Sequence, residues 1–144
     1  MILSVISGVV LLDQASKYLA LRFLQPNTPF ALIDNFLYLT LVRNSGAAFG
    51  MLKNQLLLFV AISLFAIIFI LLNLKKKNTP FLFRISLALI LAGAIGNLID
   101  RLRFGYVIDF LDLRFWPVFN LADSALTVGA LLLGWGILFK RDAA

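Results

Sequence analysis

The sequence contains no cysteine, no histidine and no glutamate, so all seven of its acidic residues are aspartate. The missing thiols and imidazoles exclude disulfides, Ser-His-Asp and Cys-His nucleophiles, and histidine or thiolate zinc sites. Carboxylate chemistry, a Ser/Lys or Thr nucleophile, or no chemistry at all is what remains. Charged residues are also scarce, at 14% of the chain.

Apolar side chains are in large excess. Of the 144 residues, 62% are hydrophobic, whereas a soluble domain has about 45–50% apolar residues. A chain of this size cannot bury so much apolar surface in its own core, and a disordered chain needs low hydrophobicity, so lipid must be the solvent. In a membrane chain, the net charge of +6 indicates topology and contact with anionic lipid. We therefore expect no nucleic-acid partner.

A helix crosses the hydrocarbon core with about 20 residues, and four stretches of the chain qualify. We predict a mainly α-helical, polytopic membrane protein that forms a single domain over residues 1–144. The predicted spans are 2–23, 56–74, 81–99 and 124–139. The first span is interpreted as a retained helix, because Asp13 and Lys17 would spoil the apolar core of a cleaved signal peptide and no basic segment precedes it.

Four spans place both termini on one side of the membrane and two loops, 24–55 and 100–123, on the other. The Lys and Arg residues outside the first span divide six to five between the two sides, which barely separates the sides. The compact Lys75–Lys77 triplet in a very short loop favours cytoplasmic termini.

Two loop segments, 35–42 and 106–115, are aromatic and β-branched. They predict a small extracytoplasmic β-cradle on the membrane surface, with Tyr106 and Trp116 near the headgroups.

Polar residues interrupt the first and third spans. Asp13 and Lys17 are four residues apart, so they share a helix face and can pair. Asn97, Asp100 and Arg101 gather on one face at the end of the third span, after a small-residue step from Ala92 to Gly96 that suits close helix packing. A functional site and a purely structural polar clamp both remain open for these groups, although charges inside a span favour function.

The loop motif RNSGAAFG at residues 43–50 carries two further candidates. Asn44 can brace another polar group, and Gly46 permits a turn or a close approach of the backbone. A plain turn that leads into the second span explains the motif equally well.

Three acids, Asp100, Asp109 and Asp123, lie at one end of the third and fourth spans or in the loop between them. Two carboxylates at an apolar surface do not both ionise readily, so one stays protonated while the other is charged, as an aspartyl hydrolase requires. Asn120 and Asp123 have the spacing of a helix cap, which places Asp123 at a positive helix end and predicts it as the ionised base. Asp109, among apolar residues, is predicted to be the neutral acid, but the residues alone do not choose between Asp109 and Asp100.

Two other functions fit the same composition. Membrane aspartates can form the relay of a small ion or proton carrier, although the chain has no inverted repeat and its second span is uncharged. Ser45 with Lys17 would make a Ser/Lys peptidase.

The motifs DQASK, RNSGAAFG, GAIGNLIDR, VIDF and FNLADS, in this order, resemble those of the lipoprotein signal peptidase (signal peptidase II) family. The resemblance runs from Asp13 to about Gly129. It implies an aspartic endopeptidase of the bacterial inner membrane. The implied reaction removes the signal peptide of a diacylglyceryl-modified prolipoprotein by cleavage before the lipidated cysteine of the lipobox.

The resemblance also implies roles for individual residues. Asp109 and Asp123 correspond to the catalytic pair of the family. The positions implied to support the site or the substrate are Asp13, Lys17, Asn44, Gly46, Asn97, Asp100, Arg101 and Asn120. Cytoplasmic termini, an outward-facing site, no metal and inhibition by globomycin-type cyclic peptides are implied as well. We further expect no cofactor and a monomer in contact with membrane lipid.

Overall fold

The computed structural model describes residues 1–46, 55–76 and 79–139. Its helices are α1 (Ile2–Phe23), α2 (Leu56–Leu74), α3 (Phe81–Phe104) and α4 (Leu121–Phe139). Among the described residues, these four helices are long and apolar enough to cross a membrane. The prediction of a mainly α-helical polytopic fold is therefore confirmed, and the first two spans have the predicted bounds.

The other two spans are longer than predicted, and local capping explains both differences. Helix α3 continues beyond residue 99 to Phe104, where Gly105 adopts a left-handed conformation with φ of +79° and donates its N–H to the carbonyl of Arg101. Helix α4 begins at Leu121 and not at residue 124, because Asn120 accepts a backbone N–H of its first turn.

A three-stranded antiparallel sheet completes the described fold, in the order β1 (Phe30–Ile33), β2 (Leu37–Asn44) and β3 (Val107–Asp112). The two predicted segments correspond to β2 and β3, so the predicted cradle is confirmed as a sheet, whereas β1 was missed. The register pairs Val42 with Asp109 and Asn44 with Val107, and it thereby brings the RNSG motif beside Asp109.

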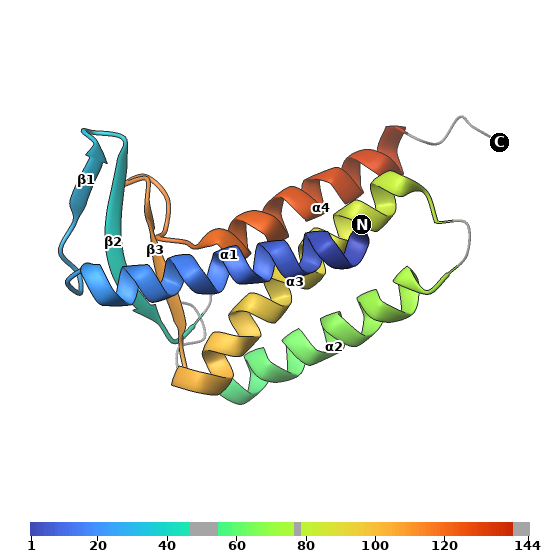
Figure 1. Cartoon of the computed structure of the whole chain (residues 1–144), viewed down its shortest axis with the longest axis horizontal. Helices are drawn as coiled ribbons and strands as arrows, with labels where there is room; N and C mark the ends of the chain where they lie inside the picture. Colours follow the sequence, from blue (N-terminus) through green and yellow to red (C-terminus); the bar gives the residue numbers. More distant parts are fainter. Residues whose placement is uncertain (47–54, 77–78, 140–144) are drawn as a thin grey trace.

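The sheet stands across one end of the helices, and the start of α1 and the end of α4 lie at the opposite end (Figure 1). Helix α3 is central, since it packs against each of the other three helices. The link between β3 and α4 is short, so the sheet and the start of α4 form one corner of the molecule (Figure 1).

Small residues allow α3 to approach its neighbours closely. A Cβ at Gly96 would lie 2.6 Å from Asp13 Oδ2 on α1, and a Cβ at Gly93 would overlap the carbonyl oxygen of Ala122 on α4. Ala92 is fully buried. The predicted close packing along this face of α3 is therefore confirmed.

Candidate active site

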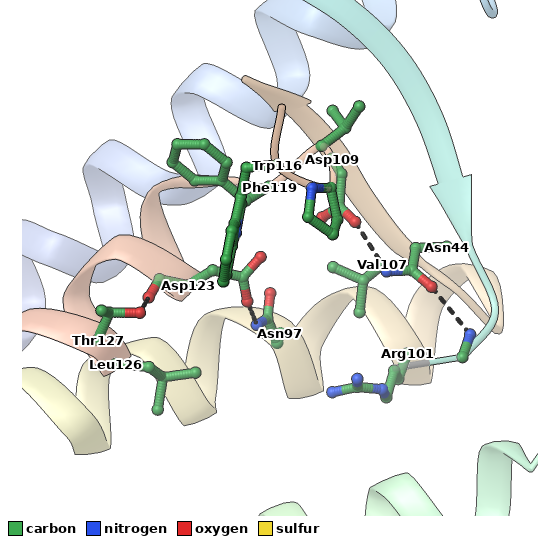
Figure 2. Close-up of a pocket in the computed structure, with 13 residues that line it drawn as sticks. Asn44, Asn97, Arg101, Val107, Asp109, Trp116, Phe119, Asp123, Leu126 and Thr127 are labelled. Carbon is green, nitrogen blue, oxygen red and sulfur yellow. Dashed lines mark hydrogen bonds between the residues drawn. The ribbon is translucent and has the colours of Figure 1, made fainter. Parts of the chain in front are cut away.

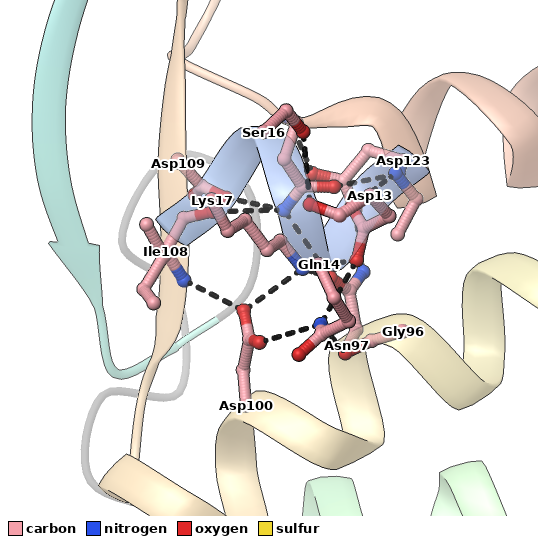
Figure 3. A network of polar contacts seen from close by, with 12 residues as sticks. Asp13, Gln14, Ser16, Lys17, Gly96, Asn97, Asp100, Ile108, Asp109 and Asp123 are labelled. Atoms are coloured by element: carbon pink, nitrogen blue, oxygen red, sulfur yellow. Dashed lines mark hydrogen bonds and ion pairs between the residues drawn. The ribbon is translucent and has the colours of Figure 1, made fainter. Parts of the chain in front are cut away.

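A cluster of charged side chains is buried where α1, α3 and β3 meet (Figure 3). Lys17 is only 1% exposed, and its Nζ lies 2.9 Å from Asp13 Oδ2 and 2.8 Å from Asp100 Oδ2. The predicted pairing of Asp13 with Lys17 is confirmed, and Asp100 joins it. Breaking a buried pair by removal of one partner typically costs about 3–5 kcal/mol, so this cluster fastens α1 to α3.

Backbone and amide donors complete the coordination of both carboxylates. Asp13 Oδ1 accepts the N–H of Ala122 at 2.9 Å, and Asp100 Oδ2 accepts the N–H of Ile108 at 3.1 Å. Gln14 Nε2 donates to both acids, at 3.1 Å and 3.0 Å. The cluster thereby also holds α4 and β3, and it gives a role to Gln14, for which the sequence predicted none.

Asn97 connects the buried cluster to Asp123. Lys17 Nζ donates to Asn97 Oδ1 at 3.0 Å, and Asn97 Nδ2 donates to Asp123 Oδ1 at 2.8 Å. An ammonium group only donates hydrogen bonds, so the amide oxygen of Asn97 must face Lys17 and the amide nitrogen must face Asp123. The lysine therefore sets the orientation of a donor to the carboxylate of Asp123.

Asn120 contacts both acids of the predicted catalytic pair. Its Nδ2 donates to Asp109 Oδ1 at 2.7 Å, while its Oδ1 accepts the N–H of Asp123 at 2.8 Å. The Asn120 N–H in turn donates to Asp123 Oδ2 at 3.3 Å, which completes a reciprocal cap at the start of α4. The predicted capping arrangement is confirmed, and the same residue bridges the two carboxylates.

Asp109 and Asp123 line one pocket of about 280 Å³ at the corner between the sheet and the helices (Figure 2). Its wall comes from the end of β2, from α3, from β3, from the 116–119 loop and from α4. The lining residues are Asn44, Gly46, Asn97, Arg101, Val107, Asp109, Trp116, Pro117, Val118, Phe119, Asp123, Leu126 and Thr127. Asp100 is not among them, because its carboxylate faces Lys17.

Asp109 is 2% exposed, and its environment favours the protonated carboxyl. Burial raises the pKa of Asp109 to about 7, and the nearby negative charge of Asp123 acts in the same direction. Hydrogen bonds from Asn44 Nδ2, at 2.9 Å, and from Asn120 oppose this rise by stabilising the ionised form. Near neutral pH, both protonation states of Asp109 are therefore accessible.

The structure distributes the predicted supporting residues over three places. Asn44, Gly46, Asn97 and Arg101 line the pocket with the two acids. Asp13, Lys17 and Asp100 form the buried cluster behind it. Asn120 lies between the two acids.

Several apolar lining residues were not predicted as part of the site. Phe119 and Leu126 carry no chemical group typical of catalysis, and Trp116 was expected near the headgroups. The signal available in the sequence was the aromatic run Phe115–Trp116 between the two acids, since a loop that joins two site residues also tends to cover the site.

The geometry does not favour the Ser/Lys alternative. All three hydrogens of the Lys17 ammonium are donated, to Asp13, Asp100 and Asn97, so no lone pair is available to a serine. Ser45 is not among the residues that line the pocket. Over residues 1–46, 55–76 and 79–139, no group of three acids is arranged to hold a metal ion.

The fold and the pocket together define a class: a polytopic membrane protein with a carboxylate-lined pocket at the sheet end of its helices. The family model described as signal peptidase (SPase) II matches residues 5–139 of the chain. The chain belongs to the signal peptidase II family and is therefore a multi-pass membrane enzyme, an aspartic-type signal peptidase that hydrolyses peptide bonds. This membership decides for the peptidase and against the ion or proton carrier.

Individual relatives agree over almost the whole chain. The lipoprotein signal peptidase of Caldanaerobacter subterraneus subsp. tengcongensis is 48% identical over 141 residues, which is 97% of each chain. That of Moorella thermoacetica is 52% identical over 90% of this chain and 87% of its own. Two solved structures of a bacterial membrane enzyme superpose with TM-scores of 0.90 and 0.89 at 32% and 33% identity. They cover 99% of this chain, and the matches span 93% and 94% of their own lengths.

Proposed function

We propose that this chain removes the signal peptide from diacylglyceryl-modified prolipoproteins and cleaves directly before the lipidated cysteine of the lipobox. In the proposed reaction, Asp123 accepts a proton from water, whose oxygen attacks the scissile carbonyl carbon. The tetrahedral intermediate then collapses: the C–N bond breaks, Asp109 donates its proton to the departing nitrogen, and the cysteine leaves with a free amino group while the signal peptide keeps the hydroxyl of the water as part of its new carboxyl group. The two carboxyls have then exchanged protonation states.

The observation that carries the proposal is that Asp109 and Asp123 share one pocket and are bridged by one residue, Asn120. The positions of the two acids in the fold support the proposed roles. Asp109 lies in β3 among buried apolar residues, where its pKa is raised to about 7. Asp123 lies in the first turn of α4, where the helix dipole stabilises negative charge.

The position of the pocket, at the sheet end of four membrane-spanning helices, suits a lipidated substrate. The acyl chains and the signal helix of such a substrate would hold it in the bilayer, so it would arrive laterally at the sheet end of the helices. Anchoring in the same plane as the pocket would supply the high local concentration that proximity catalysis needs.

The same proposal includes the surroundings of the enzyme. We infer a bacterial cytoplasmic membrane location with cytoplasmic termini, so that the sheet and the pocket face outward. We further propose that the chain acts as a monomer in contact with membrane lipid and is inhibited by globomycin-type cyclic peptides. Such peptides would compete with the substrate for the pocket that holds the two acids.

The decisive experiment incubates the purified protein in detergent with a diacylated prolipoprotein and with its unlipidated form. We expect cleavage of the lipidated form alone, with the new N-terminus at the lipidated cysteine by mass spectrometry. Asp109→Asn and Asp123→Asn should each abolish cleavage while the protein still inserts and binds substrate.

Two matched variants serve as controls. Asp34→Asn makes the same change on an exposed turn, and Ser45→Ala removes the rival nucleophile, so both should retain activity. Normal turnover by either pair variant, equal cleavage of the unlipidated form, or loss of activity on replacement of Ser45 would refute the proposal.

A further inference from the structure

A second cavity lies at the end of the molecule opposite the sheet, between the last turns of α2, the start of α3 and the later part of α4. Its volume is about 450 Å³. Phe69 on α2, Phe83 and Leu87 on α3, and Leu133 on α4 form apolar walls. Leu87 also belongs to a packed cluster with Ile70 and Leu91, so the floor of this cavity is part of the helix core.

The rim of the cavity is polar and carries positive charge. Asn73, Lys76 and Thr79 lie there, where α2 ends. Lys76 is exposed, and within the part of the chain that the structure describes its Nζ donates one hydrogen bond, to Asn73 Oδ1 at 2.8 Å. None of the aspartates in the described part of the chain lines the cavity, and none pairs with Lys76. The amine therefore has hydrogens left to donate to an anion.

This rim lies at the depth of the lipid headgroups. Helix α2 is 19 residues long, which is close to one crossing of the hydrocarbon core, and it ends immediately before Lys75. At the same end of the helices, Trp135 packs against Phe139 with ring centroids 4.1 Å apart, and both side chains are exposed. Tryptophan is enriched at the membrane–water interface, so Trp135 supports this placement.

We propose that this cavity is a binding site for one anionic phospholipid, with an acyl chain between α2, α3 and α4 and the phosphate on Lys76. The walls are apolar and the rim is cationic, which is the complement of a lipid with a negative headgroup. A soluble anion would use the rim alone, and a zwitterionic lipid would lose most of the attraction because its own cation lies beside its phosphate. The site is separate from the pocket that holds Asp109 and Asp123, and it does not depend on the proposed reaction.

Delipidated protein in detergent provides the test, with native mass spectrometry during titration with phosphatidylglycerol or with phosphatidylcholine of the same acyl chains. We expect one phosphatidylglycerol to bind more tightly than phosphatidylcholine. Lys76→Gln should weaken phosphatidylglycerol binding about fivefold, the effect of one basic residue near a membrane surface. Lys75→Gln is the matched control, because it removes the same charge from the adjacent position outside the cavity and should have a smaller effect.

A second pair of variants tests the acyl-chain part. Leu133→Trp fills the cavity and should reduce binding strongly, whereas Leu131→Trp places the same ring on an exposed part of α4 and should not. Thermal unfolding of each variant reports whether it remains folded. Equal binding of the two lipids, equal effects at Lys75 and Lys76, or full competition by inorganic phosphate would overturn the proposal.

Discussion

Asp109 is held between groups that act on its protonation in opposite directions. Burial and Asp123 raise its pKa to about 7, whereas Asn44 and Asn120 donate hydrogen bonds that stabilise its ionised form. Below this pKa the carboxyl is neutral and can donate a proton, and above it the proton is lost. The balance between burial and two amide donors therefore sets the pH range in which Asp109 can act as an acid.

The pH dependence of cleavage follows from this balance. If Asp109 donates a proton, kcat/KM should fall as the pH rises through about 7. Asn44→Ala removes a donor to the ionised form, so the pKa of Asp109 should rise further and the falling limb should move to higher pH by about half a unit to one unit. Profiles measured from pH 5 to 9 report the shift. As a control, Ser45→Ala at the neighbouring position should not move the falling limb of the pH profile. A shift of this limb to lower pH in Asn44→Ala would contradict the assignment of Asp109 as the acid.

The raised pKa of Asp109 also reduces the stability of the fold near neutral pH. Between its ordinary value of 3.8 and about 7, the folded protein keeps a proton that the unfolded chain has released, so the free energy of unfolding falls as the pH rises. The side chain of Asp109→Asn stays neutral at every pH. The free energy of unfolding of this variant relative to the wild type should therefore increase with pH, by at most about 1.4 kcal/mol per pH unit up to about pH 7, and stay constant at higher pH.

Thermal unfolding in detergent from pH 5 to 9 measures this difference. The exposed Asp34→Asn should show no such pH-dependent gain. A pH-independent difference between Asp109→Asn and the wild type would show that burial does not hold the proton on Asp109.

At this scale, the types of residue in the site could be predicted, but their partners could not. The absence of other catalytic groups directed attention to aspartate, and helix spacing correctly paired Asp13 with Lys17. Asp100, which also pairs with Lys17, lies 83 positions further along the chain. Only the packing of α1 on α3 brings these two side chains together. For the same reason, the residues alone did not decide whether Asp100 or Asp109 is the partner of Asp123. In the structure, Asp100 faces Lys17 and Asp109 faces the pocket.

At the scale of the elements, glycine residues allow the helices to pack closely. A Cβ at Gly129 on α4 would lie 2.8 Å from the carbonyl oxygen of Ser86 and 2.8 Å from Ile90 Cγ1 on α3, so a side chain there would force the two helices apart. Gly134 on the same helix has open space around it. The two positions therefore separate the effect of packing from the ordinary helix propensity of glycine.

Alanine at these two positions should have opposite effects on stability. Gly129→Ala should lower the free energy of unfolding by about 1–3 kcal/mol because it overpacks the α3–α4 contact. Gly134→Ala should be neutral or should raise stability by up to about 1 kcal/mol, since alanine is the better helix former. Thermal unfolding of the two variants in the same detergent gives the comparison. Equal unfolding midpoints would mean that α3 and α4 do not rely on this close approach.

Apolar runs predicted the existence of all four spans, but not every end. The predicted third span stops where Asp100 interrupts the apolar run, yet the helix continues because Lys17 neutralises that carboxylate and Gly105 provides the cap. Strand β1 was missed because it has only four residues, all of them exposed, and it depends on β2 for its hydrogen bonds. The ion pair with Lys17 and the pairing with β2 are tertiary contacts, and a local sequence pattern does not contain them.

At the scale of the whole molecule, the two ends of the helices differ in chemistry and in the kind of loop that carries their basic residues. The sheet lies at one end, and the end of α2 and the start of α3 lie at the other (Figure 1). The two acids line the pocket beside the sheet, whereas Lys75 and Lys76 directly follow α2 and Arg84 lies in the first turn of α3. Basic residues in short loops mark the cytoplasmic side of a membrane protein. The proposed cytoplasmic location of the termini and the proposed outward-facing pocket therefore depend on each other, because the fold places the termini and the pocket at opposite ends of the helices.

Cysteine labelling tests this orientation directly, because the natural chain has no cysteine to interfere. Thr28→Cys places a thiol in the exposed loop after α1, at the sheet end, and Thr79→Cys places one just before α3, at the opposite end. Both replacements leave every basic residue unchanged, so neither should alter the charge asymmetry that sets the topology. In spheroplasts, a membrane-impermeant maleimide should label the Thr28→Cys variant and spare the Thr79→Cys variant.

Solubilisation in detergent should make both thiols reactive, which shows that protection of the second thiol comes from the membrane and not from burial in the protein. The reverse pattern would place the two acids in the cytoplasm. A substrate whose lipidated cysteine lies at the outer surface could not then reach them, so the proposed reaction would fail together with the orientation. Labelling at both positions before solubilisation would mean that the helices do not hold one orientation, and the charge argument would then be wrong.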